Sequence, residues 1–295
     1  MSAVELDSLD AAIVRELRAD GRLPFETLAG RVGLSRAATR LRVRRLVDSG
    51  ALRVVGVPHP AVRDVGAPAH LAVAVRGGAR EAAEALARLP EAAQVGLASG
   101  PLPVRAEMRA HDLRGLTAAV ERVRALPGVR GADTLVYTDV VKDPRLSSAP
   151  PPRVRPDAVD LRLVGLLEAD GRMSFADMAG RVGLSAGAVR TRVMRLIRGG
   201  AVRVTALLDP GAVGMARYGG FTARLEERGG AAVAEITGWE HTRFLARCLG
   251  GADLVGVVAA GSVPDLGAVF ERLRRLPGVA VTETWIRLES VSGAD

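Results

Sequence analysis

The sequence predicts an α+β protein in which one unit of about 150 residues is written twice. The seven residues from Ala29 to Ser35 recur letter for letter from Ala179 to Ser185, and other matches share the same offset of 150 positions. Within each unit, apolar residues first follow a helical period and later alternate between helix-like and strand-like runs. The constant offset indicates little net insertion between the two copies.

Composition sets the outer bounds. A chain of 295 residues with 48% apolar content can bury more than one core, and a net charge of +8 favours an anionic partner such as nucleic acid. Lys142 is the only lysine, so nearly every basic residue is an arginine. The positions of the arginines are therefore more informative than their number. The lone Cys248 excludes an intrachain disulfide, and no apolar run approaches the roughly 20 residues of a membrane helix. We therefore expect a soluble, cytoplasmic protein with no membrane partner.

Each unit begins with a helix whose apolar residues lie on one stripe and which ends near Gly21 or Gly171. The stripe residues are Leu9, Ile13 and Leu17 in the first unit and Val159, Leu163 and Leu167 in the second.

Two shorter helices joined by a tight turn follow. Apolar residues at i, i+3, i+4 and i+7 from Phe25 form one stripe, and Gly33 ends that helix. Ser35 suits the N-cap of the next helix, which is rich in arginine outside its apolar face. A helical hairpin with solvated charges is the alternative for a single copy. The recurrence of the basic second helix in both copies favours a helix-turn-helix that binds DNA.

A turn and a short strand are expected after each basic helix, from Gly50 to Val55 and from Gly200 to Thr205, as in a winged helix. Arg53 and Arg203 in these strands either contact phosphate or are solvated at a strand edge.

The rest of each unit predicts the order βαββαβ. Helices on one face of an antiparallel sheet leave the other face in need of cover, which a partner sheet supplies. In the first unit we expect strands at 71–75, 94–99, 104–110 and 129–141, and helices at 80–89 and 112–126.

The junction between the units, 143–156, contains five prolines that favour an extended spacer. Its reach is at most about 45 to 50 Å, which is enough for the two units to lie side by side. We therefore expect an intrachain pseudo-dimer.

Both units resemble the Lrp/AsnC family of bacterial and archaeal feast/famine transcription regulators. The residues that carry the resemblance are Leu9-Asp10, Asp20-Gly21-Arg22, Arg31-Val32-Gly33-Leu34-Ser35, Arg42-Val43-Arg44-Arg45-Leu46 and Leu126-Pro127-Gly128-Val129. The resemblance implies a winged helix-turn-helix and a ferredoxin-like (RAM/ACT-like) effector domain whose sheets pair between protomers, often with further assembly to a higher oligomer. The implied domains are two heads, 1–58 and 157–208, two effector domains, 66–142 and 215–291, and a Pro-rich linker, 143–156.

The family typically binds an amino acid near a loop in which a glycine, two residues and an aspartate join the second and third strands. The second unit has Gly250, Gly251 and Asp253 at these positions, whereas the first has Pro101 and Pro103, which offer neither an N–H donor nor a charge. The resemblance therefore implies an amino-acid effector at the second loop. A plain hairpin turn is the alternative.

No other candidate chemistry stands out. The four histidines lack the spacing of metal ligands, and neither a nucleophile constellation nor a cofactor loop is present, so no cofactor, metal or enzymatic activity is expected. Some decarboxylases of tetrapyrrole (siroheme-type) biosynthesis also resemble this family and are the alternative function. The two basic second helices favour a transcriptional regulator that binds double-stranded DNA.

The third, basic helix of each head is expected to read DNA and is called the recognition helix below. Arg40, Arg42 and Arg45, with Arg190, Arg192 and Arg195, are the predicted phosphate contacts, and Ser35 and Ser185 cap the helices. A helical wheel places Ala37, Leu41 and Arg44 outward in the first copy, and Gly187, Thr191 and Met194 in the second. The unlike faces predict two different half-sites, and the alternative is that one head only grips the backbone. The full set of predicted DNA contacts is Ser35, Arg36, Ala37, Arg40, Leu41, Arg42, Arg44, Arg45, Arg53, Ser185, Gly187, Arg190, Thr191, Arg192, Met194, Arg195 and Arg203.

Overall fold

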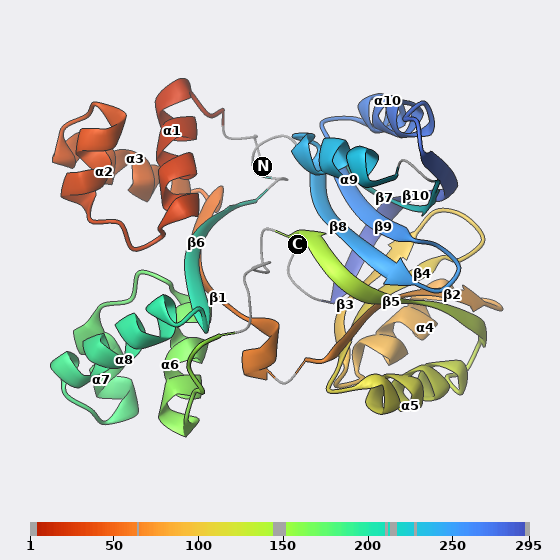
Figure 1. The fold of residues 1–295 in the computed structure, drawn as a ribbon, viewed down its shortest axis with the longest axis horizontal. Coiled ribbons are helices and arrows are strands. Elements are labelled where there is room, and N and C mark those ends of the chain that lie inside the picture. Colours follow the sequence, from red (N-terminus) through yellow and green to blue (C-terminus); the bar gives the residue numbers. More distant parts are fainter. Residues whose placement is uncertain are drawn as a thin grey trace. The chain divides into compact units, whose positions relative to one another are not determined.

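Like parts of the two copies associate with each other. The computed structural model describes residues 5–63, 65–143, 152–209, 212, 217–226 and 229–292. They divide into a head unit, drawn from Met1–Arg63 and Pro144–Gly214, and a barrel unit, drawn from Asp64–Asp143 and Met215–Asp295. Figure 1 shows that each unit combines segments from both halves of the sequence.

The head unit contains two three-helix heads built on the same plan. Thr39, Val43 and Leu46 are buried on the third helix of the first head, as the spacing predicts. Gly33 ends the preceding helix in the left-handed conformation, with φ of 70°. The helices are α1 (Ser8–Ala19), α2 (Phe25–Val32) and α3 (Arg36–Asp48) in the first head, and α6 (Ala158–Ala169), α7 (Phe175–Val182) and α8 (Ala186–Arg198) in the second.

The strand expected after each basic helix is present, and its partner is the strand of the other copy. β1 (Leu52–Pro58) and β6 (Val202–Leu208) pair antiparallel as a two-stranded sheet, followed in the first copy by a short 3-10 helix, η1 (Pro60–Arg63). The core of the head unit accordingly contains buried residues from both copies. The two heads therefore share one core.

Gly21 and Gly171 allow the chains of the two heads to approach closely. The Gly21 N–H donates to the Val204 carbonyl at 2.9 Å, and the Gly171 N–H donates to the Val54 carbonyl at 2.8 Å. A Cβ atom at either glycine would lie 2.9 Å from backbone atoms of these strands. The repeated Asp-Gly-Arg motif thus contains a glycine because no side chain fits.

The barrel unit confirms the predicted α+β fold class. Each half has the order βαββαβ, and in the first half the element ends lie within a few residues of the expected ones. The first half contains β2 (Ala67–Val75), α4 (Ala79–Ala87), β3 (Ala92–Ala98), β4 (Val104–Ala110), α5 (Leu113–Arg124) and β5 (Val129–Lys142). The second contains β7 (Arg217–Leu225), α9 (Gly229–Gly238), β8 (Thr242–Leu249), β9 (Leu254–Ala260), α10 (Val263–Arg274) and β10 (Val279–Ser292).

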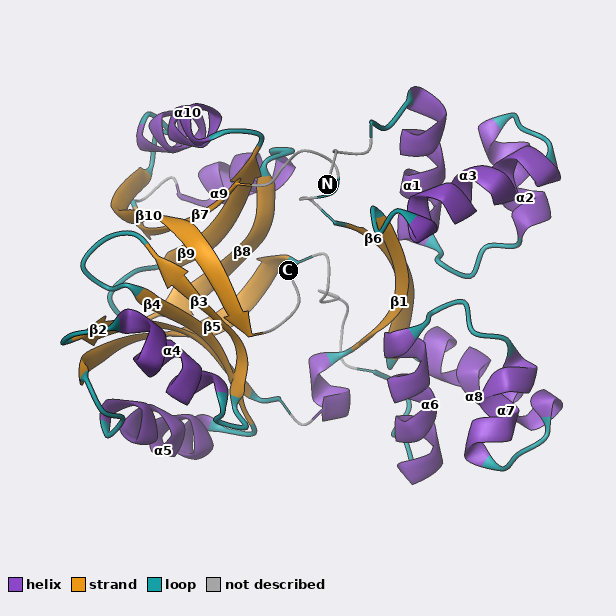
Figure 2. Cartoon of the chain, turned by 180° about the vertical axis from the view of Figure 1, so that it is seen from behind, coloured by secondary structure: helices purple, strands orange, loops and turns teal. Residues whose placement is uncertain are grey.

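The two sheets join at both edges into a closed eight-stranded barrel, in the order β10-β3-β4-β2-β5-β8-β9-β7. The seams between the halves are the antiparallel pairs β5–β8 and β10–β3. Each half packs its own helices on its sheet, and the helices lie on the outside of the barrel (Figure 2). A further cluster draws on both halves, and includes Leu135, Tyr137, Cys248 and Trp285. Closure leaves no exposed sheet edge between the halves.

No helix in the described part of the chain is long and apolar enough to cross a membrane.

Candidate nucleic-acid interface

The recognition helix of the first head, α3, presents its predicted outward face to solvent. The Ser35 hydroxyl accepts a hydrogen bond from the Ala38 N–H at 3.2 Å and so caps the helix. Leu41 is 70% exposed, which is unusual for a large apolar side chain. Arg44 is also exposed and forms an ion pair with Asp48 one turn later, at 3.3 Å. This face therefore offers an apolar group and a cation, and base contact by either stays a prediction.

The equivalent helix α8 has the same cap and a different face. The Ser185 hydroxyl accepts from the Ala188 N–H, again at 3.2 Å. Thr191 is exposed, and its hydroxyl donates to the Gly187 carbonyl of its own helix at 3.1 Å. Met194 is half-buried. The second helix thus offers solvent a methyl group and a thioether where the first has an isobutyl group and a guanidinium.

A buried aspartate ties the first recognition helix to the leading helix. The Asp10 carboxylate is fully buried and accepts hydrogen bonds from Arg42, at 3.0 Å, and from Arg45. Arg42 also pairs with Asp7 at 2.6 Å. The pKa of Asp7 is lowered by the Asp10 backbone N–H and by Arg42, and the same carboxylates raise the pKa of Arg42.

The second head repeats this arrangement. Asp160 is fully buried and accepts from Arg192, at 2.9 Å, and from Arg195, while Asp157 accepts from Arg192 at 2.7 Å. The pKa of Asp157 is lowered by Arg192 first and by the Asp160 N–H second.

These ion pairs involve four of the arginines that were predicted to contact phosphate. Carboxylates of the leading helix and its cap pair with Arg42, Arg45, Arg192 and Arg195 and so fix the recognition helices, and phosphate contact by these arginines stays a prediction. Sequence reasoning missed these pairs, although a signal was present. Asp10 lies in the apolar stripe of α1, at i−3 from Ile13, and recurs as Asp160. A carboxylate in an apolar stripe needs a buried partner.

Arg40 and Arg190 are exposed and occupy the same position in the two recognition helices. The Arg40 guanidinium lies 5.4 Å from the centre of the Phe25 ring. Neither arginine forms an ion pair with a carboxylate among the described residues. Arg36, at the amino end of α3, lies 3.7 Å from the exposed Glu26. Arg53 is exposed on β1, and Arg203 is half-buried on β6.

Two arginines cross between the heads in a reciprocal clamp. Arg22 donates to the Gly171 carbonyl at 2.7 Å and to the Met173 carbonyl at 3.0 Å, and its guanidinium lies over the ring of Phe175. In return, Arg172 donates to two carbonyls of the first head and lies over a ring there. Its partners are Gly21 at 2.8 Å, Leu23 at 3.1 Å and the Phe25 ring.

Burial lowers the pKa of both clamp arginines, Arg22 and Arg172, yet an arginine with such partners stays charged. The clamp and the β1–β6 sheet hold the two recognition helices at a fixed separation within the head unit.

The loop predicted to bind an effector is a tight turn between β8 and β9. Asp253 accepts the Leu225 N–H with its carboxylate at 2.8 Å, and its backbone bonds both neighbouring strands. Gly250 has φ of 138°, and a Cβ atom there would lie 2.7 Å from the Thr134 carbonyl. Gly251 is exposed, with open space around it. These contacts give Asp253 and Gly250 structural roles in the turn, and effector binding at this loop stays a prediction.

The barrel contains a polar cluster that joins the two halves. The buried Arg105 of β4 donates to Glu283 of β10, and its guanidinium lies 4.1 Å from the centre of the Trp285 ring. The imidazole of His70 stacks on the same tryptophan at a centroid distance of 5.4 Å. Burial, and then the charge of Arg105, lowers the pKa of His70 to about 3. The sequence did not predict that His70 and Trp285 meet.

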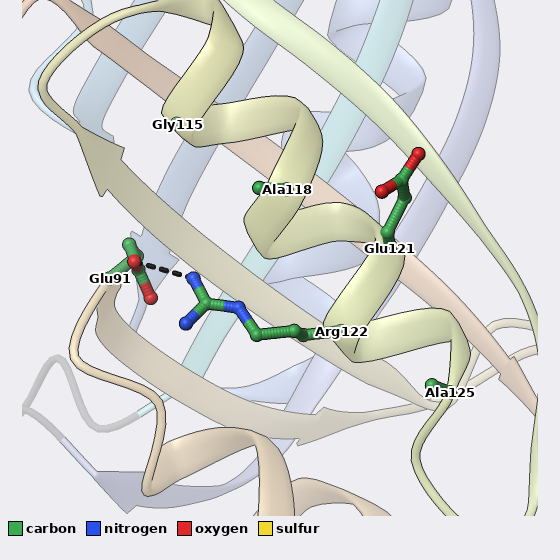
Figure 3. Close-up of a pocket in the computed structure, with 6 residues that line it drawn as sticks. All are labelled: Glu91, Gly115, Ala118, Glu121, Arg122 and Ala125. Carbon is green, nitrogen blue, oxygen red and sulfur yellow. Dashed lines mark hydrogen bonds and ion pairs between the residues drawn. The ribbon is translucent and has the colours of Figure 1, made fainter.

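A shallow depression lies on the outer face of α5 (Figure 3). Small residues and one ion pair, between Arg122 and Glu91 at 2.6 Å, line it together with Glu121. It contains none of the predicted site residues. No group of three or more potential metal ligands is found among the residues that the structure describes.

Comparison with known protein families gives a match in each of the two heads. A family model of the AsnC-type helix-turn-helix domain matches residues 6–47 and 157–197. An uncharacterised HTH-type transcriptional regulator of Pyrococcus abyssi is 30% identical over 142 residues, which cover 47% of this chain and 90% of that protein. The proline dehydrogenase transcriptional activator of Rhizobium radiobacter is 28% identical over 149 residues, covering 47% and 93%. Each relative thus corresponds in length to one of the two units.

A likeness over nearly the whole chain exists among solved structures. The siroheme decarboxylase NirDL superimposes with a TM-score of 0.66 and 15% identity, covering 98% of this chain and 93% of that one. At this identity the likeness concerns the fold.

Proposed function

We propose, because this chain belongs to the Lrp/AsnC family of helix-turn-helix transcriptional regulators, that it regulates transcription by binding double-stranded DNA and responds to a small metabolite. The observation that carries the proposal is the pair of capped, arginine-bearing recognition helices held in one compact unit.

Each recognition helix has the features that DNA contact requires. The amino end of a helix attracts phosphate through its free N–H groups and its dipole. Arg40 and Arg190 stand one turn further along, exposed and without a carboxylate partner among the described residues. The buried stripe of each helix fixes which side is turned outward. Affinity then comes from phosphate contacts, and sequence preference from the outward side chains.

Binding by two heads also requires a fixed separation between the recognition helices, and the clamp provides it. A helix-turn-helix dimer binds two half-sites because its recognition helices have a set separation. Here Arg22 and Arg172 provide that constraint between two heads of one chain.

The salt dependence of DNA binding tests the proposal. The slope of log K against log salt is negative, and removing an arginine that contacts one phosphate reduces its magnitude by about 0.9. We expect that decrease for Arg40→Ala, the same for Arg190→Ala, and the sum for the double variant. Arg114→Ala, which removes an exposed arginine from α5, is the matched control and leaves the slope unchanged. Slopes equal to that of the wild type in all of these variants would contradict DNA binding through these helices.

The effector part of the proposal concerns the loop with Gly250, Gly251 and Asp253. A carboxylate beside glycine N–H groups complements the ammonium and carboxylate of an amino acid. Titration calorimetry with each proteinogenic amino acid should find at most one site per chain. Asp253→Asn keeps an acceptor for the Leu225 N–H but removes the charge, so it should retain the stability of the turn and lose binding. Unchanged binding in this variant, or two equivalent sites, would contradict the assignment.

The alternative function is a tetrapyrrole decarboxylase, and the likeness of fold to NirDL is the observation that favours it. An absorbance scan of the purified protein, alone and with added iron-uroporphyrin III, separates the two functions. A bound tetrapyrrole band would favour the enzyme, and its absence together with DNA binding favours the regulator.

A further inference from the structure

We infer that this chain reads an operator composed of two unlike half-sites. The inference rests on the proposed DNA binding and adds the class of DNA sequence that is recognised. It follows from two observations. The contacts that hold the recognition helix, called the frame below, are the same in both heads, whereas the outward faces of the two helices differ.

The bonds that hold each recognition helix and cross between the heads are repeated in the two copies. Both recognition helices have 13 residues, begin after a serine cap and bury three residues against their own head. Both are anchored by two arginines on a fully buried aspartate, Asp10 or Asp160. The crossing bonds agree closely, at 2.7 Å from Arg22 to Gly171 and 2.8 Å from Arg172 to Gly21. The two helices therefore meet DNA in equivalent ways.

The outward faces carry different chemistry. The first presents Leu41, 70% exposed, and Arg44, whose side chain is 77% exposed. An arginine can bond guanine O6 and N7, and an isobutyl group can pack on a thymine methyl. The second presents Thr191 and Met194. The Thr191 hydroxyl is used within its own helix, so this face offers chiefly apolar contacts.

Charge also differs along the two helices. The first begins with Arg36, where the second has Ala186, and ends in Asp48, where the second has Arg198. Extra positive charge therefore lies at the amino end of α3 and at the carboxyl end of α8. Register on the phosphate backbone is set by such charged side chains. The two half-sites are thus expected to differ in their phosphate contacts at the helix ends as well as in the bases that are read.

A homodimer reads a palindrome because its two heads are identical. This chain combines equivalent placement with unlike reading residues, so its operator should lack two-fold symmetry. The clamp fixes the spacing, and the half-site centres are expected about 10 base pairs apart or at a multiple of that distance.

Selection of bound duplexes from a random pool tests the inference, using the intact chain and one variant. Leu41→Thr with Arg44→Met gives the first reading face the same two side chains that Thr191 and Met194 provide in the second. The wild type should select two unlike half-sites, and the variant should select a symmetric site. Its affinity for the wild-type operator should fall about tenfold to a hundredfold, because Leu41 and Arg44 no longer touch the bases.

The chain offers a matched control. Leu113 and Arg114 are exposed neighbours on α5, and Leu113→Thr with Arg114→Met makes the same chemical changes away from the heads. This control should select the wild-type operator with unchanged affinity. Because all four residues are exposed, circular dichroism should show the same fold in every protein.

Each outcome is decisive. Two unlike half-sites that become symmetric in the head variant support the inference. A symmetric consensus with the wild type, or enrichment of a single half-site, overturns it while leaving the proposed function intact. No enrichment at all contradicts the proposed function, and the inference fails with it.

Discussion

Each head depends on a carboxylate that is buried within an otherwise apolar stripe. Asp10 lies among Ile13, Val14 and Leu17 on the buried face of α1, where an unpaired charge would be strongly unfavourable. Two arginines from α3 satisfy it, and Asp160 repeats the arrangement. A helical wheel separates the buried from the outer side of α3, but it does not show whether an arginine at the edge points to DNA or to α1. The carboxylate that decides this lies more than 30 positions earlier in the chain.

Asp10→Asn should destabilise the first head by about 2 to 3 kcal/mol, because two charge-assisted hydrogen bonds lose their charged acceptor in a buried position. The partly exposed arginines keep the destabilisation below that of a fully buried pair. Urea denaturation followed by circular dichroism measures the change. Asp48→Asn, which removes the exposed partner of Arg44, should cost at most about 0.5 kcal/mol. Equal effects of the two substitutions would show that Asp10 is no anchor.

His70 should make the barrel unit sensitive to acid. Its pKa is lowered to about 3 in the folded chain from an ordinary value of 6.5, so between these values the unfolded chain binds the extra proton. Above pH 6.5 His70 does not reduce the free energy of unfolding. As the pH falls from 6.5 toward 3, protonation of the unfolded chain lowers the free energy of unfolding progressively. Both tryptophans, Trp239 and Trp285, lie in the barrel unit, so their fluorescence reports its unfolding.

Urea midpoints should accordingly fall between about pH 7 and about pH 4.5 in the wild type, and the fall should be smaller in His70→Gln. The exposed His111 provides the control, since His111→Gln should preserve the wild-type dependence. A pH dependence unaffected by the loss of His70 would contradict the neutral state of this half-buried imidazole.

At the scale of elements, local patterns predicted more than pairings did. The period of apolar residues predicted the helices of each head and the βαββαβ order, because burial of one face is a local requirement. Sequence periodicity contains no information on which strand of the other copy becomes the neighbour. For this reason the β1–β6 pair and the two barrel seams emerged only from the structure. For the same reason the contacts of Arg22 and Arg172 with the other head were not predicted, although both arginines belong to the repeated Asp-Gly-Arg motif.

The pair of Arg105 and Glu283 should couple the two halves of the barrel. The counterparts of these residues at the repeat offset are Val255 and Asp133, so the pair has no equivalent across the repeat. In a double-mutant cycle with Arg105→Met and Glu283→Gln, we expect a coupling energy of about 1 to 3 kcal/mol, because Arg105 is buried. Arg80 and Glu289 also join the halves but are exposed, and their coupling should be about 0 to 1 kcal/mol. A coupling no larger than that of the exposed pair would refute the assigned role.

At the scale of the whole molecule, joining two units in one chain removes the need for them to be alike. A short linker gives an effective concentration of about millimolar, so we expect the halves to meet without depending on the concentration of the protein. Residues 144–151 of the expected linker lie outside the described residues. Once paired within a chain, each half can change independently. Leu41 against Thr191, Arg105 against Val255, and Pro103 against Asp253 are such differences. In a homodimer each of these changes would occur twice.

Both heads on one DNA site should belong to the same chain, and mixing two half-inactive chains tests this most directly. Arg40→Glu and Arg190→Glu reverse an exposed charge in one head each, and the two variants are co-expressed so that they assemble together. If the two heads of a site come from one chain, the mixture should bind the selected operator no better than the stronger variant alone. If the heads come from different chains, intact heads combine, and recovery of a wild-type fraction in the binding curve would contradict the intrachain pairing of heads.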